Sequence, residues 1–128
     1  MGKQGLIRFQ PNGMGDDGIP TTKVERPSLK EGTPVEGVSE FVRSESGELT
    51  AGVWTCTPCT EEISDYPVDE FMQILEGRIV ITCPGEAPQT FKAGDSLFVA
   101  KGTSFTWKVE ETARKYYVIY ESKSQARA

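Results

Sequence analysis

The sequence predicts an all-β domain, and three observations carry that prediction. From residue 38 onward, short runs of β-branched and aromatic residues alternate with Gly, Pro, Ser and Asp turn signals. No window of about ten residues keeps a helical hydrophobic period. The chain of 128 residues has the length of one domain. Many short strands with regular turns indicate a β-sandwich or a β-barrel.

Each expected strand is bounded by a turn signal. Residues 45–48 form a turn after the first strand, and Pro58 follows the second. Glu76-Gly77 is typical of a tight hairpin, and residues 84–86 turn the chain again. Residues 60–65 are expected as a loop, although they have room for one helical turn. The eight expected strands cover residues 38–43, 49–56, 70–75, 78–83, 89–92, 96–100, 104–109 and 114–121.

The segment before these strands is expected to be an extended arm. Residues 1–36 are rich in Gly, Pro, Asp and Thr, and only residues 6–9 resemble a short strand. Such an arm can lie across its own barrel or across a partner subunit. Residues 37–121 are expected to form the β domain, and residues 122–128 a polar tail.

Charge and composition limit the partners. The net charge of −5 argues against electrostatic capture of nucleic acid or of an anionic membrane. No apolar stretch is long enough to span a bilayer, and the first residues do not read as a secretion signal. The chain has three cysteines, an odd number, and nothing suggests the disulfide framework of a secreted protein. We therefore expect a cytoplasmic protein with no nucleic-acid or membrane partner.

Several spaced motifs occur in a recognisable order within roughly residues 38–121. They are Gly52-Val53-Trp54, Tyr66-Pro67, Asp69-Glu70, Leu75-Glu76-Gly77, Gly94-Asp95, Trp107 and Arg114-Lys115-Tyr116-Tyr117. In this order they resemble the small single-domain cupins grouped with ureidoglycine aminohydrolase and the ethanolamine-utilisation cupins. The resemblance implies a cupin (RmlC-like jelly roll) β-barrel with an extended N-terminal arm. It also implies a homodimer, with strands or arms exchanged between subunits.

The resemblance does not extend to the metal ligands. Metal-binding cupins place two histidines before the motif carboxylate and a third after a Pro-x-Gly turn. These positions fall here near Ser64, at Tyr66 and at Phe105, and the chain has no histidine. One carboxylate, Glu70, with hydroxyl helpers is a poor transition-metal site. We therefore expect no metal and no other cofactor.

The family places the carboxylate equivalent to Glu70 inside the barrel, and strand parity extends the set of inward residues. Side chains alternate along a strand, so Met72 and Ile74 should share the face of Glu70. The expected lumen residues are Trp54, Tyr66, Glu70, Met72, Phe105, Trp107, Lys115 and Tyr117. This set predicts an aromatic pocket with one acid at its wall, suited to a small, partly apolar ligand.

Each key lumen residue has two possible roles. Glu70, desolvated among rings, is a candidate catalytic acid or base, or else a structural partner of Lys115, Arg114 or Tyr66. The two tryptophans are core residues or a ligand platform. Lys115 is an exposed edge lysine or the counter-charge for an anionic substrate.

The spacing of Cys56 and Cys59 matches a CxxC motif. Such a pair can act in redox chemistry, or form half of a zinc site that Cys83 would extend. A redox pair normally opens a helix, whereas this one follows an expected strand. Plain packing or surface thiols are the favoured interpretation.

Three functions fit these observations. The first is a small-molecule-binding cupin that works without a catalytic metal. The second is an enzyme of the aminohydrolase, lyase or isomerase type with Glu70 as general acid or base. The third is a non-catalytic interaction module that docks through residues 1–36. The sequence does not identify the ligand.

Overall fold

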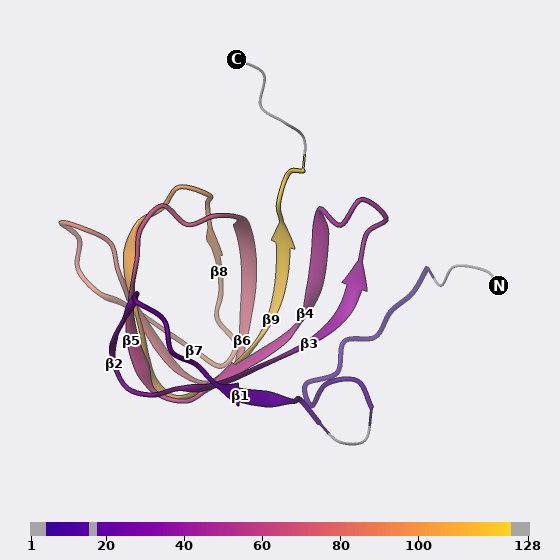
Figure 1. Ribbon diagram of the computed structural model, residues 1–128, viewed down its shortest axis with the longest axis horizontal. Coiled ribbons are helices and arrows are strands. Elements are labelled where there is room, and N and C mark those ends of the chain that lie inside the picture. The colour runs from indigo at the N-terminus through magenta and orange to yellow at the C-terminus, as the bar shows by residue number, and fades with distance from the viewer. Residues whose placement is uncertain (1–4, 16–17, 124–128) are drawn as a thin grey trace, which may run out of the picture.

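The chain forms one strongly curled antiparallel sheet, shown in Figure 1. The computed structural model describes residues 5–15 and 18–123. The strands in those residues are β1 (Thr21–Lys23), β2 (Leu29–Glu31), β3 (Val35–Arg43), β4 (Leu49–Cys56), β5 (Cys59–Ile63), β6 (Asp69–Thr82), β7 (Gln89–Lys92), β8 (Ser96–Val99) and β9 (Phe105–Tyr120). The sheet curls into a half-barrel, which confirms the predicted all-β class.

The longest strand organises this sheet. One side of β9 pairs with β4 through its C-terminal half and with β5 through its N-terminal half. Its other side pairs with β6 along nearly the whole length. The short strands β7 and β8 then extend β6, whereas β3 and β1 continue outward from β4. Because β6 and β9 run through the centre, their inward side chains meet on one concave face.

The predicted hairpin at Glu76-Gly77 is wrong. Strand β6 runs without a turn through these residues, and the register between β6 and β9 shifts there. Gly77 has a φ of 89°, and a Cβ at this position would lie 2.2 Å from the carbonyl oxygen of Thr112. The glycine therefore serves a bulge that bends two paired strands rather than a chain reversal. The two expected C-terminal strands are likewise one strand, β9.

Three further differences concern segments that read as loop or strand. Residues 60–65 were expected as a loop but contain most of β5. Along this strand Cys59 and Glu61 are buried and Glu62 is exposed, which is the alternation of a strand. Residues 6–9 are not a strand, and the short strands of the N-terminal segment are β1 and β2 instead. They form by pairing with β3 and β5, which is a long-range effect that local sequence does not encode.

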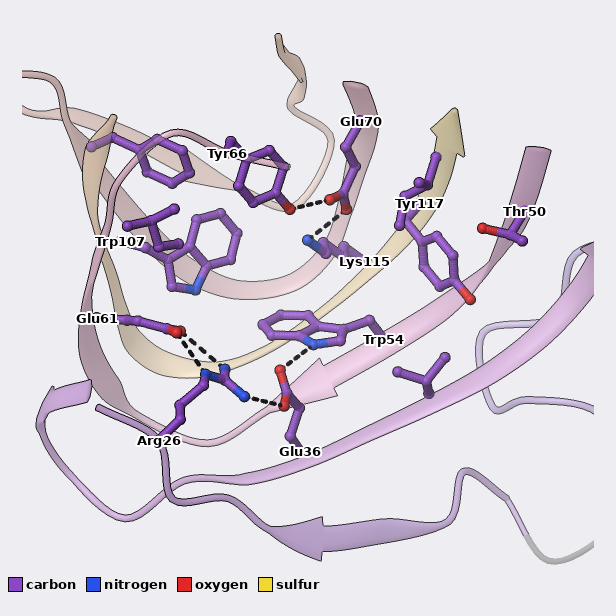
Figure 2. Close-up of a pocket in the computed structure, with 14 residues that line it drawn as sticks. Arg26, Glu36, Thr50, Trp54, Glu61, Tyr66, Glu70, Trp107, Lys115 and Tyr117 are labelled. Atoms are coloured by element: carbon purple, nitrogen blue, oxygen red, sulfur yellow. Dashed lines mark hydrogen bonds and ion pairs between the residues drawn. The ribbon is translucent and has the colours of Figure 1, made fainter. Parts of the chain in front are cut away.

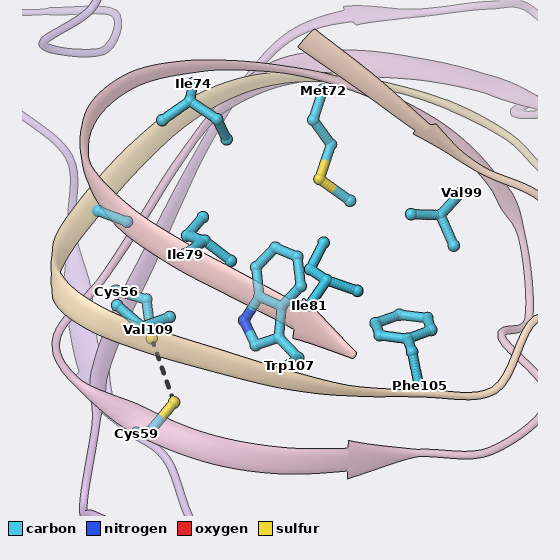
Figure 3. Close-up of a cluster of buried hydrophobic side chains, with 11 residues drawn as sticks. Cys56, Cys59, Met72, Ile74, Ile79, Ile81, Val99, Phe105, Trp107 and Val109 are labelled. Carbon is cyan, nitrogen blue, oxygen red and sulfur yellow. Dashed lines mark hydrogen bonds between the residues drawn. The ribbon is translucent and has the colours of Figure 1, made fainter. Parts of the chain in front are cut away.

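The hydrophobic core fills the concave face beside β6 and β9, as Figure 3 shows. Met72 and Ile74 are each 1% exposed, which confirms the predicted inward parity of β6. Phe105, Trp107 and Val109 are also buried, as expected for β9. Asp95 caps the turn before β8, since its carboxylate accepts a hydrogen bond from the Lys92 amide at 2.9 Å.

The residues described include no helix with the length and apolar character needed to cross a membrane.

Candidate functional site

A cavity of about 340 Å³ opens beside this core, and most of the predicted lumen residues line it. Figure 2 shows their side chains pointing into the space enclosed by the curled strands. The predicted residues on the wall are Trp54, Tyr66, Glu70, Phe105, Trp107, Lys115 and Tyr117. Met72, the eighth, lies beneath the wall in the core, where its sulfur is 3.2 Å from the Lys115 ammonium.

Three polar side chains form a connected group on this wall. Glu70 comes from β6, Lys115 from the facing part of β9, and Tyr66 from the loop before β6. Glu70 accepts a hydrogen bond from the Tyr66 hydroxyl on one carboxylate oxygen. Its other oxygen lies 3.0 Å from the Lys115 ammonium. The Glu70 and Lys115 side chains are 4% and 6% exposed, so this ion pair is buried.

The proton on Tyr66 is held firmly. Burial raises the pKa of the Tyr66 hydroxyl, and the neighbouring negative charge of Glu70 raises it further. Tyr66 is therefore a hydrogen-bond donor to Glu70 at neutral pH. The interpretation of Glu70 as a partner of Tyr66 and Lys115 matches these contacts, whereas Arg114 pairs with Glu76 instead.

Two indole rings enclose the Lys115 ammonium. Its nitrogen lies 4.5 Å from the centroid of the Trp54 ring and 4.8 Å from that of Trp107. The rings meet edge to face, with centroids 5.8 Å apart. Each face attracts the cation through its π electrons. Lys115 is therefore an interior cation, and its interpretation as an exposed edge lysine is wrong.

A second polar cluster lies at the opposite side of the cavity. Arg26, in the segment between β1 and β2, donates two hydrogen bonds to the Glu61 carboxylate, at 2.6 and 3.0 Å. Glu61 also accepts one from Ser28 at 2.6 Å. Glu36 accepts one from the Trp54 indole nitrogen at 2.7 Å. This cluster thus joins the N-terminal segment to the cavity wall.

The ionisation of this second cluster follows from its contacts. Burial alone would raise the pKa of Glu61, but the hydrogen bonds from Arg26 and Ser28 outweigh it, and the pKa is lowered. The hydrogen bond to Glu61 in turn raises the pKa of Arg26. Both groups are therefore charged at neutral pH.

The sequence did not point to Arg26, Glu36 or Glu61 as site residues. Residues 1–36 read as an arm, and β5 read as a loop, so neither seemed to reach the cavity. The alternation of Cys59, Glu61 and Ile63 between polar residues was the available signal for an inward Glu61.

The remaining predicted residues shape the wall. The Phe105 ring packs against those of Tyr66 and Trp107, with centroids 5.5 and 6.4 Å away. Tyr117 shares the inward face of β9 with Lys115. Burial, and to a smaller extent the negative charge of Glu40, raise the pKa of the Tyr117 hydroxyl to about 12. The wall is therefore aromatic over much of its surface, with polar groups concentrated at two ends.

The donor atoms here do not fit the metal site that the fold family implies. At the positions of the family's histidines stand a serine, the Tyr66 hydroxyl and the Phe105 ring, which cannot ligate. Glu70 is already bonded to an ammonium and a hydroxyl. Across residues 5–15 and 18–123, no group of three or more Cys, Asp or Glu residues can hold a metal ion.

The cysteine pair formed by Cys56 and Cys59 lies outside the cavity wall. Their sulfurs are 4.0 Å apart and both thiols are free and buried. Burial raises the pKa of both thiols. A protonated, buried thiol is a poor nucleophile and a poor metal ligand, so these contacts favour packing over the redox and zinc interpretations.

The family comparison is consistent with this architecture. The family described as the EutQ-like cupin domain matches residues 43–117. That range contains β4 to β8 and most of β9, and with them the whole Tyr66, Glu70 and Lys115 group. No curated protein matches the chain.

Solved structures show the same fold. A protein of unknown function from the DUF861 family of Pseudomonas syringae is 25% identical, with a TM-score of 0.72, over 79% of this chain and 43% of its own. The EutQ protein of Clostridium difficile is 23% identical, with a TM-score of 0.60, over 70% of this chain and 65% of its own. A putative ethanolamine utilization protein Q from Salmonella typhimurium is 20% identical, also with a TM-score of 0.60, over 82% of this chain and 97% of its own. This chain thus spans less than half of the Pseudomonas protein and about two thirds of the Clostridium protein.

Proposed function

The chain belongs to the EutQ-like cupin domain family, and from this premise we propose that it binds a small, partly apolar molecule without the help of a metal ion. The ligand lies in the cavity whose wall includes the indole rings of Trp54 and Trp107. Lys115 supplies the positive charge that a metal supplies in the histidine-bearing relatives.

The observation that carries this proposal is the buried pair of Glu70 and Lys115 on the wall of a cavity of about 340 Å³. Burying a charge costs several kcal/mol before the attraction between the two charges is counted. Well-packed apolar residues in place of a buried ion pair often give equal or greater stability. A pair that faces a cavity is therefore more economically explained by a ligand than by folding alone.

The cavity wall indicates the chemistry of this ligand. Aromatic rings contact its apolar part, and the Lys115 ammonium contacts an oxygen or another electron-rich atom. The volume accommodates a molecule of roughly eleven to seventeen non-hydrogen atoms at about 20 to 30 Å³ each. A filled interior would have excluded binding inside the barrel, and the cavity is open to a ligand instead.

Intrinsic fluorescence tests the proposal directly. The chain has two tryptophans, and both line the cavity. Titration with small aromatic alcohols, amides and aldehydes, benzyl alcohol among them, should give a saturable change in tryptophan emission for at least one compound. Metal analysis of protein purified without a tag should find no stoichiometric metal.

Two variants on β9 provide the matched comparison. Ile119 lines the cavity, whereas its neighbour Val118 does not. Ile119→Phe should fill part of the cavity and weaken binding by tenfold or more, while Val118→Phe should leave it unchanged. No saturable change with any compound, or one equivalent of tightly held metal, contradicts the proposal.

The same group of residues favours a catalytic role as a second candidate. Glu70 is held in place by the Tyr66 hydroxyl and faces the Lys115 ammonium in the cavity wall, so it is placed to exchange a proton with Lys115 or with a bound ligand. Glu70→Gln should then abolish turnover of a bound ligand while the tryptophan titration still reports binding. Turnover at the native rate in this variant would exclude the role.

A further inference from the structure

We propose that Lys115 is a nucleophilic amine that captures a small neutral aldehyde or ketone as a Schiff base inside the cavity. This inference rests on the proposed function, because the carbonyl compound must first occupy the same cavity. It adds the class of ligand and a covalent step.

The charges around the cavity favour a neutral ligand over an anion. Among the described lining residues, Arg26 and Lys115 are cations, and Glu36, Glu61 and Glu70 are carboxylates. Three negative charges against two positive ones give an anion no net attraction. Both cations are also already paired, Lys115 with Glu70 at 3.0 Å and Arg26 with Glu61 at 2.6 Å. A neutral carbonyl group does not need to separate either pair to enter.

The position of Lys115 suits attack on such a group. Its side chain is buried, yet it lines the cavity, so a ligand that occupies the cavity can reach it. Glu70 is within hydrogen-bond distance of that nitrogen and can accept its proton.

The reaction balances with these groups alone. Glu70 takes one proton from the Lys115 ammonium, and the freed nitrogen lone pair forms a bond to the carbonyl carbon. The carbonyl π electrons move to oxygen, which takes that proton back from Glu70. A second ammonium proton follows the same route, the C–O bond breaks, and water leaves. The product is a protonated imine on Lys115, facing the Glu70 carboxylate, with no oxidant or reductant consumed.

Tyr66 positions the proton carrier. Its hydroxyl donates to one carboxylate oxygen and leaves the other oxygen facing the Lys115 nitrogen. The rings of Trp54 and Trp107, which lie against the ammonium, are placed equally well against a cationic imine. The cavity thus stabilises the positive charge both before and after the step.

Reductive trapping tests the inference on the full chain. The protein is incubated with benzaldehyde and sodium cyanoborohydride near neutral pH, and the hydride converts any imine to a stable secondary amine. Intact-mass measurement should show one benzyl group per chain, and peptide mapping should place it on Lys115. Excess benzyl alcohol, which occupies the cavity without reacting, should slow this labelling.

Variants identify the reacting nitrogen. Lys115→Arg should lose the adduct, whereas Lys108→Arg should retain it, because Lys108 lies on the same strand with half of its side chain exposed. Glu70→Gln should slow the adduct by roughly 100-fold, the usual scale for losing a general acid or base. The mapping on the unaltered chain stands even if a variant fails to fold.

The outcomes separate this inference from the proposed function. A benzyl group spread over exposed lysines, with none on Lys115, overturns the inference. If benzyl alcohol still produces a saturable change in tryptophan emission, the proposed function stands without the covalent step. If there is neither an adduct nor saturable binding across the panel of compounds, both fail.

Discussion

Replacement of Lys115 by methionine removes one half of the buried pair and leaves most of the side-chain volume in place. The Glu70 carboxylate, 4% exposed, then loses its ion-pair partner at 3.0 Å and keeps only the Tyr66 hydroxyl. Breaking a buried pair by removing one partner costs about 3–5 kcal/mol. Because methionine retains the packing of the lysine stem, we expect about 3 kcal/mol of lost unfolding free energy, from uncompensated charge rather than from a cavity.

Equilibrium urea unfolding, followed by circular dichroism under reducing conditions, measures this loss. Lys108→Met is the control, since its exposed position on β9 predicts a change within about 0.5 kcal/mol. The double variant Glu70→Gln with Lys115→Met should recover about 2 kcal/mol, because the neutral amide still accepts from Tyr66. A loss below about 1 kcal/mol in Lys115→Met, or no recovery in the double variant, would refute the reasoning that the pair is a coupled, buried charge unit.

Four further predictions concern other parts of the chain. The pKa of Glu61 is lowered from its ordinary value of 4.5 in the folded protein. The pairing of Glu61 with Arg26 therefore stabilises the fold at pH values above 4.5, and this stabilisation is lost as the pH falls through the lowered pKa of the folded state. Arg26→Gln should therefore lose stability at neutral pH and show a flatter decline between about pH 5 and pH 3 in thermal melts, and an unchanged decline would contradict the pairing. Iodoacetamide should modify Cys83 before the buried cysteine pair in the native protein, and equal rates by peptide mass would exclude that difference in burial. Gly77→Ala should cost at least about 2 kcal/mol, because a Cβ would lie 2.2 Å from a backbone oxygen, whereas Gly47→Ala, with a similar φ of 81° and open surroundings, should cost about half as much in the same unfolding assay. The homodimer implied by the cupin resemblance predicts twice the 14.1 kDa mass of one chain by light scattering, and a mass of one chain would exclude it.

The all-β fold and the Glu70 end of the site could be predicted from the sequence, because both depend on local motifs and on alternation along single strands. The cupin resemblance placed Glu70 inside the barrel, and the two-residue alternation extended that inward face to Met72 and Ile74. Gly77 has the positive φ of a hairpin glycine, but such a glycine suits a bulge as well as a hairpin. Only the pairing of β6 with β9 along both sides of that glycine decides between the two.

The other end of the site could not be found locally. Arg26 reaches Glu61 across 35 positions of sequence because β2 pairs with β5. Both strands are short and partly polar, so the alternation of Cys59, Glu61 and Ile63 in β5 was too brief to identify a strand. Long-range strand pairing therefore brings Arg26 to the cavity wall, although composition alone assigned its segment to an extended arm.

A crystallographic fragment screen on the full-length chain tests the central claim most directly. Small aromatic alcohols and aldehydes should give density in the cavity lined by Trp54 and Trp107, with an oxygen atom within hydrogen-bond distance of the Lys115 nitrogen. Density for fragments only on the outer surface, or a metal ion bound to Glu70 in place of the lysine contact, would contradict it.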